Sequence, residues 1–186
     1  MVTIRQERTA DVAAREALLD LAYGPVRFRK PSERLRAGRR PADGLSLIAV
    51  EDGRVVGTVR LWEVSAGATC PLLLLGPLAV HPDSRQRGIG AALMRCALHE
   101  ASRRGHRAVL LVGDAAYYGR FGFSAERTGT LWLPGLDAPH RLLGRELSPG
   151  ALDGAGGVIR APERPARTGR VAARAERLGA STPRAA

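Results

Sequence analysis

Two arginines and two glycines lie close together in the segment Arg85-Gln86-Arg87-Gly88-Ile89-Gly90, between an apolar run and a segment of helical periodicity. In a strand-to-helix turn, Gly88 and Gly90 allow a tight bend and let a ligand approach the backbone amides without a Cβ in the way. The amides of a first helical turn have no partner inside the helix and lie at the positive end of its dipole. We therefore predict a phosphate site at this turn, where Arg85 and Arg87 add positive charge.

Three phosphate-binding patterns can be compared with this turn. A Walker loop requires Gly-Lys-Ser/Thr after its first glycine, and the segment has no such triplet. A dinucleotide-binding fingerprint requires a third glycine, and Leu93 occupies that position. The remaining pattern, Arg/Gln-x-x-Gly-x-Gly/Ala directly after a strand, matches residues 85–90.

Further motifs accompany the turn and carry a family resemblance. The segment LGPLAVHPDSRQRGIGAALM, residues 75–94, joins an apolar strand, a Val-x-Pro exit and the turn. The run AVLLV follows at residues 108–112, and AYYGRFGF at residues 116–123 contains the aromatic pair Tyr117 and Tyr118. Together these motifs resemble the GNAT superfamily of acyl-CoA-dependent N-acyltransferases, and an uncharacterised bacterial subgroup in particular. The resemblance covers residues 2–150.

The resemblance implies an α/β fold in which a mixed central β-sheet has helices on both faces and a splay between the fourth and fifth strands. Acetyl-CoA, as co-substrate, would lie in the splay, with its pyrophosphate on the turn and its pantetheine beside the fourth strand. The residues implied in this binding are Leu78, Val80, Arg85, Gln86, Arg87, Gly88, Ile89, Gly90, Ala91 and Tyr118. The Gly76-Pro77 pair independently predicts irregular pairing, because proline cannot donate a ladder hydrogen bond and glycine often marks a bulge.

The resemblance also implies a reaction and two catalytic groups. An amine would attack the thioester directly, the backbone N–H of Val80 would stabilise the oxyanion, and Tyr118 would protonate the departing thiolate. A phenol with a pKa of about 10 keeps its proton at pH 7 and can serve as this acid. Packing on the sheet is the alternative role for Tyr118 and the favoured role for Tyr117, while Asp114 is predicted to cap the short helix that carries them.

A general base is harder to assign from the sequence. The predicted fourth strand, residues 70–80, contains no titratable side chain except that of Cys70. Glu63 on the preceding strand and His81 at the strand exit are the nearest candidates. A chain of water molecules, or an amine that arrives already neutral, would serve equally well.

The acceptor site is implied to include the segment of residues 23–40 and the late strands. The candidate substrate-binding residues are Phe28, Arg29, Trp62 and Glu63. Positive charge in the segment, from Arg27, Arg29, Lys30 and Arg34, would favour an acceptor that carries a carboxylate or a phosphate, and a solvated basic face is the alternative interpretation. The acceptor itself could be a small molecule, a peptide amine or a protein lysine.

Local patterns predict the elements that must position these residues. Residues 2–6 alternate as a strand, residues 9–24 have helical periodicity, and residues 45–64 form a hairpin around Asp52-Gly53. The remaining predicted elements are a short basic helix capped by Ser32, a strand over 70–80, a helix over 88–104, a strand over 108–112, a short helix after Asp114, and strands within 124–133 and 140–147. This order of strands and helices is typical of an α/β architecture.

The net charge of +11 raises the possibility of a nucleic-acid partner. Lys30 is the only lysine, and arginine shares GC-rich codons with the abundant alanine, glycine and proline, so genome composition explains part of this charge. Nucleic acid is therefore not the favoured partner. Cys70 and Cys96 form no metal-binding pattern, so we expect reduced, buried thiols and no metal.

The N-terminal residues carry charge where a signal peptide requires an apolar stretch, and apolar runs fall short of the roughly 18 residues that span a bilayer. We therefore expect a cytoplasmic protein with no membrane partner. A homodimer is one option for its oligomeric state. Besides the acetyltransferase, two other functions stay open: an acyl-CoA-binding sensor or regulatory module of the same fold without catalysis, and a basic nucleic-acid-binding protein.

Residues 1–160 are expected to form one acyltransferase domain and residues 161–186 a basic, disordered tail. The tail has no aromatic residue and only one valine and one leucine, too little apolar surface to join a core. We expect deletion of residues 161–186 to leave the melting temperature and the affinity for acetyl-CoA unchanged. A large fall in melting temperature would contradict this assignment.

Overall fold

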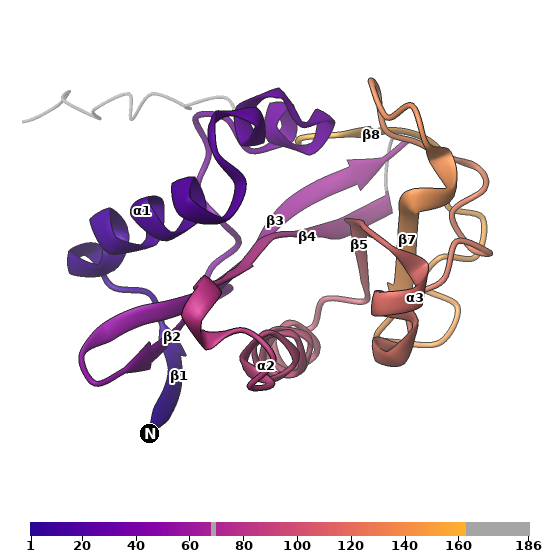
Figure 1. Ribbon diagram of the computed structural model, residues 1–186. Coiled ribbons are helices and arrows are strands. Elements are labelled where there is room, and N and C mark those ends of the chain that lie inside the picture. The colour runs from indigo at the N-terminus through magenta and orange to yellow at the C-terminus, as the bar shows by residue number, and fades with distance from the viewer. Residues whose placement is uncertain (68–69, 163–186) are drawn as a thin grey trace, which may run out of the picture.

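The computed structural model describes residues 1–67 and 70–162 (Figure 1). In this part of the chain the strands are β1 (Val2–Gln6), β2 (Ser46–Glu51), β3 (Arg54–Ala66), β4 (Cys70–Val80), β5 (Ala108–Val112), β6 (Leu131–Trp132), β7 (Leu142–Glu146) and β8 (Gly157–Arg160). The α-helices are α1 (Val12–Tyr23), α2 (Ile89–Arg103) and α3 (Ala115–Tyr118). Short 3₁₀ helices cover Thr9–Asp11, Pro25–Arg29, Pro31–Leu35, Pro82–Ser84, Gly119–Phe121 and Pro139–Arg141. None of the described helices is long and apolar enough to cross a membrane.

The sheet is mixed, as the sequence predicts. Its main path runs β1-β2-β3-β4-β5-β7, and β8 pairs with the end of β3 and with β6. Neighbouring strands are antiparallel except for the parallel pairs β4 with β5 and β6 with β8. The expected α/β architecture is therefore confirmed.

Helices cover both faces of the sheet (Figure 1). The helix α2 buries Ile89, Leu93 and Ala97 in a core that also contains Leu73 and Leu75 of β4. The helix α1 packs Leu18 and Leu19 against Ala79, which points from β4 to the opposite face because side chains alternate along a strand. Both faces of β4 are thus covered, and the position of its far end is fixed by packing on two sides.

The pairing of β4 with β3 is interrupted at Gly76-Pro77, as predicted. Leu75 lies opposite Leu61 and Leu78 lies opposite Val59, so two residues of β4 face the single residue Arg60 of β3. This two-to-one arrangement is a bulge, and it redirects the strand beyond it. Trp62 stabilises the bulge, since its indole Nε1 donates a hydrogen bond to the carbonyl of Gly76 at 2.7 Å.

The strands β4 and β5 separate after a short contact. They pair only at Leu73 with Val109 and at Leu74 with Leu110. Over its full length β5 instead pairs with β7. The remainder of β4, from Leu75 to Val80, therefore has no partner strand on this side, and the expected splay between the fourth and fifth strands is confirmed.

Two local predictions need correction. The basic helix predicted to be capped by Ser32 is wrong, because the chain forms two 3₁₀ helices in this region: Pro25–Arg29, which lies before the predicted helix, and Pro31–Leu35, which replaces its start. Ser32 is buried inside the second of these and does not cap it. The two cysteines, Cys70 and Cys96, are free thiols as expected, but they are half-buried and not buried.

The late strands also differ from the prediction. The strand expected within 124–133 shrinks to Leu131–Trp132, and it pairs with β8, which the sequence patterns did not predict. Ala161, predicted to begin the tail, packs half-buried against the core cluster that includes Ile159. The rest of the predicted tail, residues 163–186, lies outside the described residues.

Candidate functional site

The turn after β4 leaves a set of backbone amides without partners. Gly88 adopts the left-handed conformation, with φ 77° and ψ 0°, directly before α2. The first amide of α2 that donates within the helix is that of Ala92, to the carbonyl of Gly88 at 2.9 Å. The amides from Gln86 to Ala91 have no hydrogen-bond acceptor among the described residues. Free amides at a helix N-terminus are the arrangement that binds phosphate groups in proteins.

A cavity of about 530 Å³ opens at this turn. Its lining residues are Val80, Ser84, Arg85, Gln86, Gly88, Ile89, Gly90, Ala91, Tyr117 and Arg120. A Cβ at Gly88 would meet no protein atom within 4 Å, so the space in front of this residue is open. The turn can therefore accept a bulky anion, and its free amides fit the pyrophosphate of acetyl-CoA.

The two arginines predicted at the turn differ in their placement. Arg85 lines the cavity. The guanidinium of Arg87 is turned away from it and forms a bidentate ion pair with Glu51, with N–O distances of 2.6 and 2.8 Å. This pair raises the pKa of Arg87 and lowers that of Glu51. Only the backbone of Arg87 therefore remains available at the turn.

Arg120 supplies a charge at this cavity that the sequence analysis missed. It lines the cavity from the segment after α3, and its guanidinium carbon lies 4.1 Å from the ring centre of Tyr117. It occupies a variable position of the AYYGRFGF motif, directly after the aromatic pair and one glycine. Its position in the motif was the only signal for it, because arginines are common throughout this chain.

The free edge of β4 faces the splay. The amide of His81 donates to the carbonyl of Val56 on β3 at 2.8 Å, and hydrogen bonds to one neighbour alternate along an antiparallel strand. The backbone groups of Leu78 and Val80 therefore point away from β3. The hydroxyl of Tyr23, from α1, donates to the carbonyl of Leu78. The N–H of Val80 stays on the open side.

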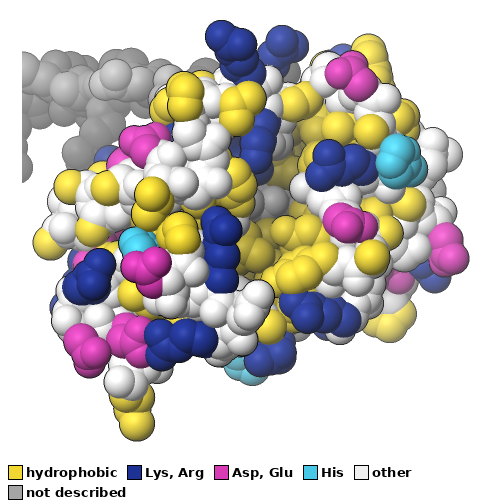
Figure 2. All heavy atoms as spheres, viewed as in Figure 1, with side chains coloured by type: hydrophobic (Ala, Val, Ile, Leu, Met, Phe, Trp, Pro, Cys, Tyr) yellow, Lys and Arg dark blue, Asp and Glu magenta, His cyan; other side chains and the backbone are white. Residues whose placement is uncertain are grey.

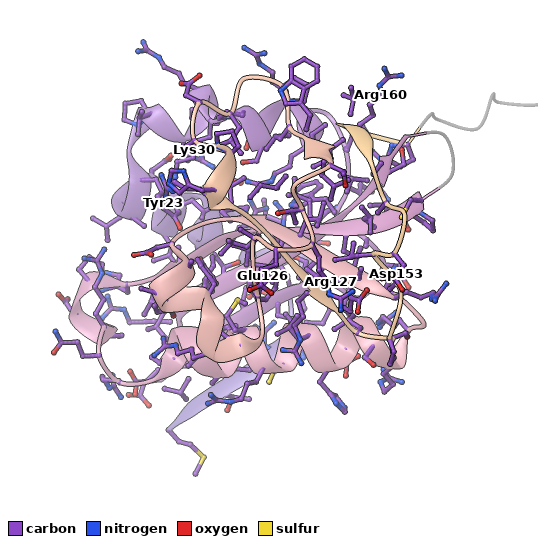
Figure 3. The ribbon with its side chains drawn as sticks, turned by 90° about the vertical axis from the view of Figure 1, so that its right-hand side faces the viewer. Tyr23, Lys30, Glu126, Arg127, Asp153 and Arg160 are labelled. Carbon is purple, nitrogen blue, oxygen red and sulfur yellow. The ribbon has the colours of Figure 1, made fainter. Side chains whose placement is uncertain are left out.

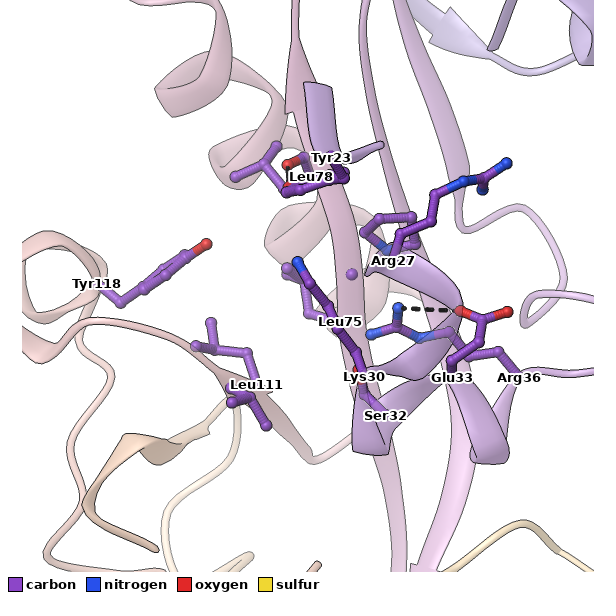
Figure 4. A pocket seen from close by; sticks show the side chains of 13 residues that line it. Tyr23, Arg27, Lys30, Ser32, Glu33, Arg36, Leu75, Leu78, Leu111 and Tyr118 are labelled. Atoms are coloured by element: carbon purple, nitrogen blue, oxygen red, sulfur yellow. Dashed lines mark hydrogen bonds and ion pairs between the residues drawn. The ribbon is translucent and has the colours of Figure 1, made fainter. Parts of the chain in front are cut away.

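A second cavity, of about 90 Å³, lies in the splay itself (Figure 4). Its lining residues are Tyr23, Arg27, Lys30, Ser32, Glu33, Arg36, Leu75, Gly76, Pro77, Leu78, Leu111, Val112 and Tyr118. Figure 2 shows this region as a hollow with an apolar floor and basic side chains along its rims. Figure 4 shows Tyr118 on one side of the cavity, with Lys30 and Arg36 across from it.

Tyr118 is held at the splay by its neighbours. The carboxylate of Asp114 accepts a hydrogen bond from the amide of Ala116 at 3.0 Å, which confirms the predicted cap of α3. The ring of Tyr118 meets the edge of Tyr117, with ring centres 4.8 Å apart. Burial, followed by the neighbouring tyrosines, raises the pKa of Tyr118 to about 12. The phenol therefore carries its proton throughout the neutral pH range.

Gly113 makes room for this ring. A Cβ at Gly113 would lie 2.2 Å from Cε2 of Tyr118, far inside van der Waals contact. We expect Gly113→Ala to displace the phenol and to lower kcat by about ten- to a hundredfold, because small misplacements of a reacting group have large effects on rate. The measurement is kcat for the variant, together with the dissociation constant for acetyl-CoA, which should change little.

The matched control for this change is Gly119→Ala. Gly119 follows α3, has an ordinary helical backbone conformation and would place its Cβ in open space. The control variant should keep the parent's kcat. Equal rates for the Gly113 variant and the parent would show that the position of the Tyr118 ring does not matter.

The predicted acceptor residues do not meet at one place. Trp62 is 5% exposed and lies under the bulge, whereas Phe28 is 59% exposed. Arg29 and Glu63 are also exposed, and none of these four residues lines the splay cavity. Arg27 does line it, but Asp20 and Glu16 pair with its guanidinium.

The candidate bases also lie outside the splay cavity. Neither Glu63 nor His81 lines it, and the ring of His81 accepts a hydrogen bond from the amide of Asp83 at 3.3 Å. Glu33 is the only carboxylate among the lining residues. The structured residues contain no group of three histidine, cysteine, aspartate or glutamate side chains that could hold a metal ion.

Comparisons with known proteins agree with this arrangement. The family described as "Acetyltransferase (GNAT) domain" matches residues 42–125. The uncharacterised N-acetyltransferase YhbS of Escherichia coli K12 is 32% identical over 120 residues, which cover 62% of this chain and 70% of YhbS. YjhQ, another uncharacterised N-acetyltransferase of that strain, is 36% identical over 87 residues, 45% of this chain and 47% of YjhQ. The match therefore spans about half the length of YjhQ.

Solved structures extend the similarity to the whole fold. The crystal structure of E. coli YhbS in complex with CoA is similar with a TM-score of 0.71 and 28% identity, covering 87% of this chain and 89% of YhbS. A GNAT family acetyltransferase from Brucella melitensis in complex with acetyl-CoA gives a TM-score of 0.67 and 29% identity. That alignment covers 87% of this chain and 96% of the Brucella protein.

Proposed function

The chain belongs to the GNAT superfamily of N-acetyltransferases, and from that premise we propose that it transfers an acetyl group from acetyl-CoA to a primary amine. One observation carries the proposal. The free edge of β4 runs from the splay cavity at Leu78 to the turn cavity at Val80, two residues further on. A single elongated ligand with an anionic end and a thioester end fits such a continuous edge. The similar structures with bound CoA and acetyl-CoA support this choice of ligand.

The turn would hold the phosphate end of acetyl-CoA. The free amides between Gln86 and Ala91 would donate to the pyrophosphate, and Arg85 and Arg120 would add charge at the mouth of the cavity. The backbone groups of Leu78 and Val80 would pair with the pantetheine amides in the manner of an added strand. The carbonyl of Leu78 already accepts from Tyr23, so its N–H is the group of this residue that remains for pairing.

The chemistry would take place beside Tyr118, at the splay end of the free edge. A neutral amine would attack the carbonyl carbon of the thioester, forming the C–N bond, and a free backbone N–H of this edge would donate to the developing oxyanion. The C–S bond would then break, and Tyr118 would give its proton to the sulfur. The proton released from the amine nitrogen would return to the phenolate or leave through water. The raised pKa of Tyr118 fits this role, because the phenol is fully protonated before the step.

The proposal is tested by measuring thiol release from acetyl-CoA across a panel of amine acceptors, with binding of acetyl-CoA measured separately. We expect binding, and acceptor-dependent release of CoA together with an N-acetylated product identified by mass spectrometry. Binding without product for any amine would favour the regulatory module of the same fold. Retardation of nucleic acid at physiological ionic strength, without acetyl-CoA binding, would favour the nucleic-acid-binding protein.

A further inference from the structure

Arg36 follows the 3₁₀ helix Pro31–Leu35 and is buried in the wall of the splay cavity. Its side chain is 9% exposed, and its guanidinium donates no hydrogen bond within the described residues. Nε is fully buried without a partner, and the nearest carboxylate oxygen, on Glu33, lies 3.9 Å from Nη1. Nη2 lies close to Gly76 of the bulge, where a Cβ would approach it to 2.9 Å. Figure 4 shows the guanidinium directed into the cavity.

A buried guanidinium with unmade hydrogen bonds is unusual in a folded protein. Burial lowers the pKa of Arg36 to about 10, so the group is still a cation at neutral pH. A buried cation is destabilising unless an anion or several acceptors compensate it, and buried polar groups are nearly always hydrogen-bonded. The protein therefore presents at this place a planar set of donors that a bound anion would satisfy.

Lys30 contributes a second cation to the same cavity. Its ammonium lies 4.0 Å from the ring centre of Tyr23, and Figure 3 shows the two side chains together. Partial burial of its otherwise exposed side chain, followed by the charges of Arg36 and Arg141, lowers the pKa of Lys30. These neighbouring cations repel its charge, so an anion near Lys30 would relieve this repulsion as well.

The charges around the cavity favour a bound anion. Arg27 is neutralised by Asp20 and Glu16. Among the lining residues, Lys30 and Arg36 remain against the single carboxylate of Glu33, and the charge of Arg141 also acts on Lys30, so the cavity is net positive. A carboxylate would balance part of this charge, and its two oxygens match the planar guanidinium of Arg36 in a bidentate pair.

We propose that Arg36, together with Lys30, binds a carboxylate of the acceptor, so that the preferred substrates are small amines that also carry a carboxylate. This inference rests on the proposed acetyl transfer and names the class of acceptor. Tyr118 faces these two cations across the cavity (Figure 4). An acceptor anchored by its carboxylate at Arg36 would direct its amine toward the free edge of β4 and the thioester.

The test compares acceptors that differ only in the carboxylate. The panel contains α-amino acids and ω-amino acids, each beside its own carboxamide, and kcat/KM is measured for every pair. We expect the best acid to exceed its amide by about ten- to a hundredfold, the range expected for hydrogen bonds to a charged group. In Arg36→Met the ratio should fall close to one, while the slow reaction of the amide is kept. Arg36→Lys should restore part of the ratio, since it restores the charge but not the bidentate geometry.

Arg34→Met is the matched control, because Arg34 lies in the 3₁₀ helix that directly precedes Arg36, is exposed and does not line this cavity. It should keep the full ratio between acid and amide. Without acceptor, Arg36→Met should melt at or above the temperature of the parent, because it removes an uncompensated buried cation. Its affinity for acetyl-CoA should equal that of the parent.

Failure of this inference can be told from failure of the proposed function. Acetylation of amides as fast as acids, a ratio that survives Arg36→Met, or a clear fall in the melting temperature of that variant would overturn the carboxylate site. If no amine is acetylated, the site is judged by the melting temperature with CoA present. If the acids raise the melting temperature and their amides do not, and if Arg36→Met abolishes this rise, the result would support the carboxylate site without the reaction. If the acids do not raise the melting temperature, the site is overturned.

Discussion

Gly88→Val is expected to remove most of the stabilisation that acetyl-CoA gives to the folded protein. Gly88 lies in the left-handed region, with φ 77°, directly before α2. A β-branched residue strongly resists this conformation, so the turn should adopt another backbone path and its free amides should no longer converge. The space around the Cβ is open, so the expected loss comes from backbone strain and from obstruction of the phosphate, not from a clash with the protein.

The measurement is the melting temperature with and without acetyl-CoA. At about 100 times its dissociation constant, the ligand should stabilise the parent by about 2.7 kcal/mol, or about 5 to 11 °C for a domain of this size. Gly105→Val is the matched control. Gly105 has φ 82° and an open Cβ position at the opposite end of α2, so it carries the same strain away from the turn. The control should lose intrinsic stability but keep the full shift with acetyl-CoA.

A folded Gly88→Val protein that gains the full shift would contradict the assignment of the turn as a phosphate site. The arginines provide a finer comparison in the same assay. Arg85 lines the cavity, while the guanidinium of Arg87 is paired with Glu51. Arg85→Ala should therefore weaken acetyl-CoA binding more than Arg87→Ala, although the sequence alone ranks the two residues equally.

Tyr118→Phe is expected to lower kcat by about ten- to a thousandfold while leaving the affinity for acetyl-CoA nearly unchanged, because an acid assists only in the transition state. We expect the lower end of this range, since a thiol with a pKa of about 8.5 is already a fair leaving group. The raised pKa of Tyr118, about 12, points the same way, because it makes the phenol a weaker acid. The measurement is single-turnover acetyl transfer, which isolates the chemical step from product release.

Tyr117→Phe is the matched control for this change. Tyr117 is adjacent in the chain and meets the ring of Tyr118, but it lines the turn cavity and not the splay cavity. Its hydroxyl should therefore contribute little to the chemical step. If both variants transfer the acetyl group at the rate of the parent, Tyr118 has only a packing role.

Local sequence patterns were sufficient for much of the fold. The strand β5 and the helix α2 match the predicted bounds to within a residue, because β5 is a short uninterrupted apolar run and α2 repeats its apolar positions at helical spacing. The irregular pairing at Gly76-Pro77 was also predictable, since proline cannot donate a ladder hydrogen bond and glycine in a strand often marks a bulge. The family resemblance then placed Gly88 and Tyr118 by motif, without any knowledge of their surroundings.

Elements that depend on a neighbouring strand or on proline geometry could not be predicted from local patterns. β8 has four residues and weak periodicity, and it exists because β3 extends beyond β2 and leaves an edge at Ser65 and Ala66 for it to pair with. The 3₁₀ helix Pro31–Leu35, which begins with the fixed backbone angle of Pro31, replaced the start of the helix predicted to be capped by Ser32. In both cases tertiary packing or proline geometry outweighed local propensity.

By itself, the sequence determined the fold class and the turn at Gly88, because apolar periodicity and glycine spacing are local properties that need no knowledge of distant residues, and it indicated the family through the resemblance of its motifs. Only the tertiary structure decided which of many arginines have partners. Arg27 and Arg36 lie nine positions apart in one basic segment, yet the first is paired with two carboxylates and the second is buried without a hydrogen bond. The physical reason is that a charge is compensated by groups that folding brings close to it, and the distances between these groups cannot be read from the amino-acid composition.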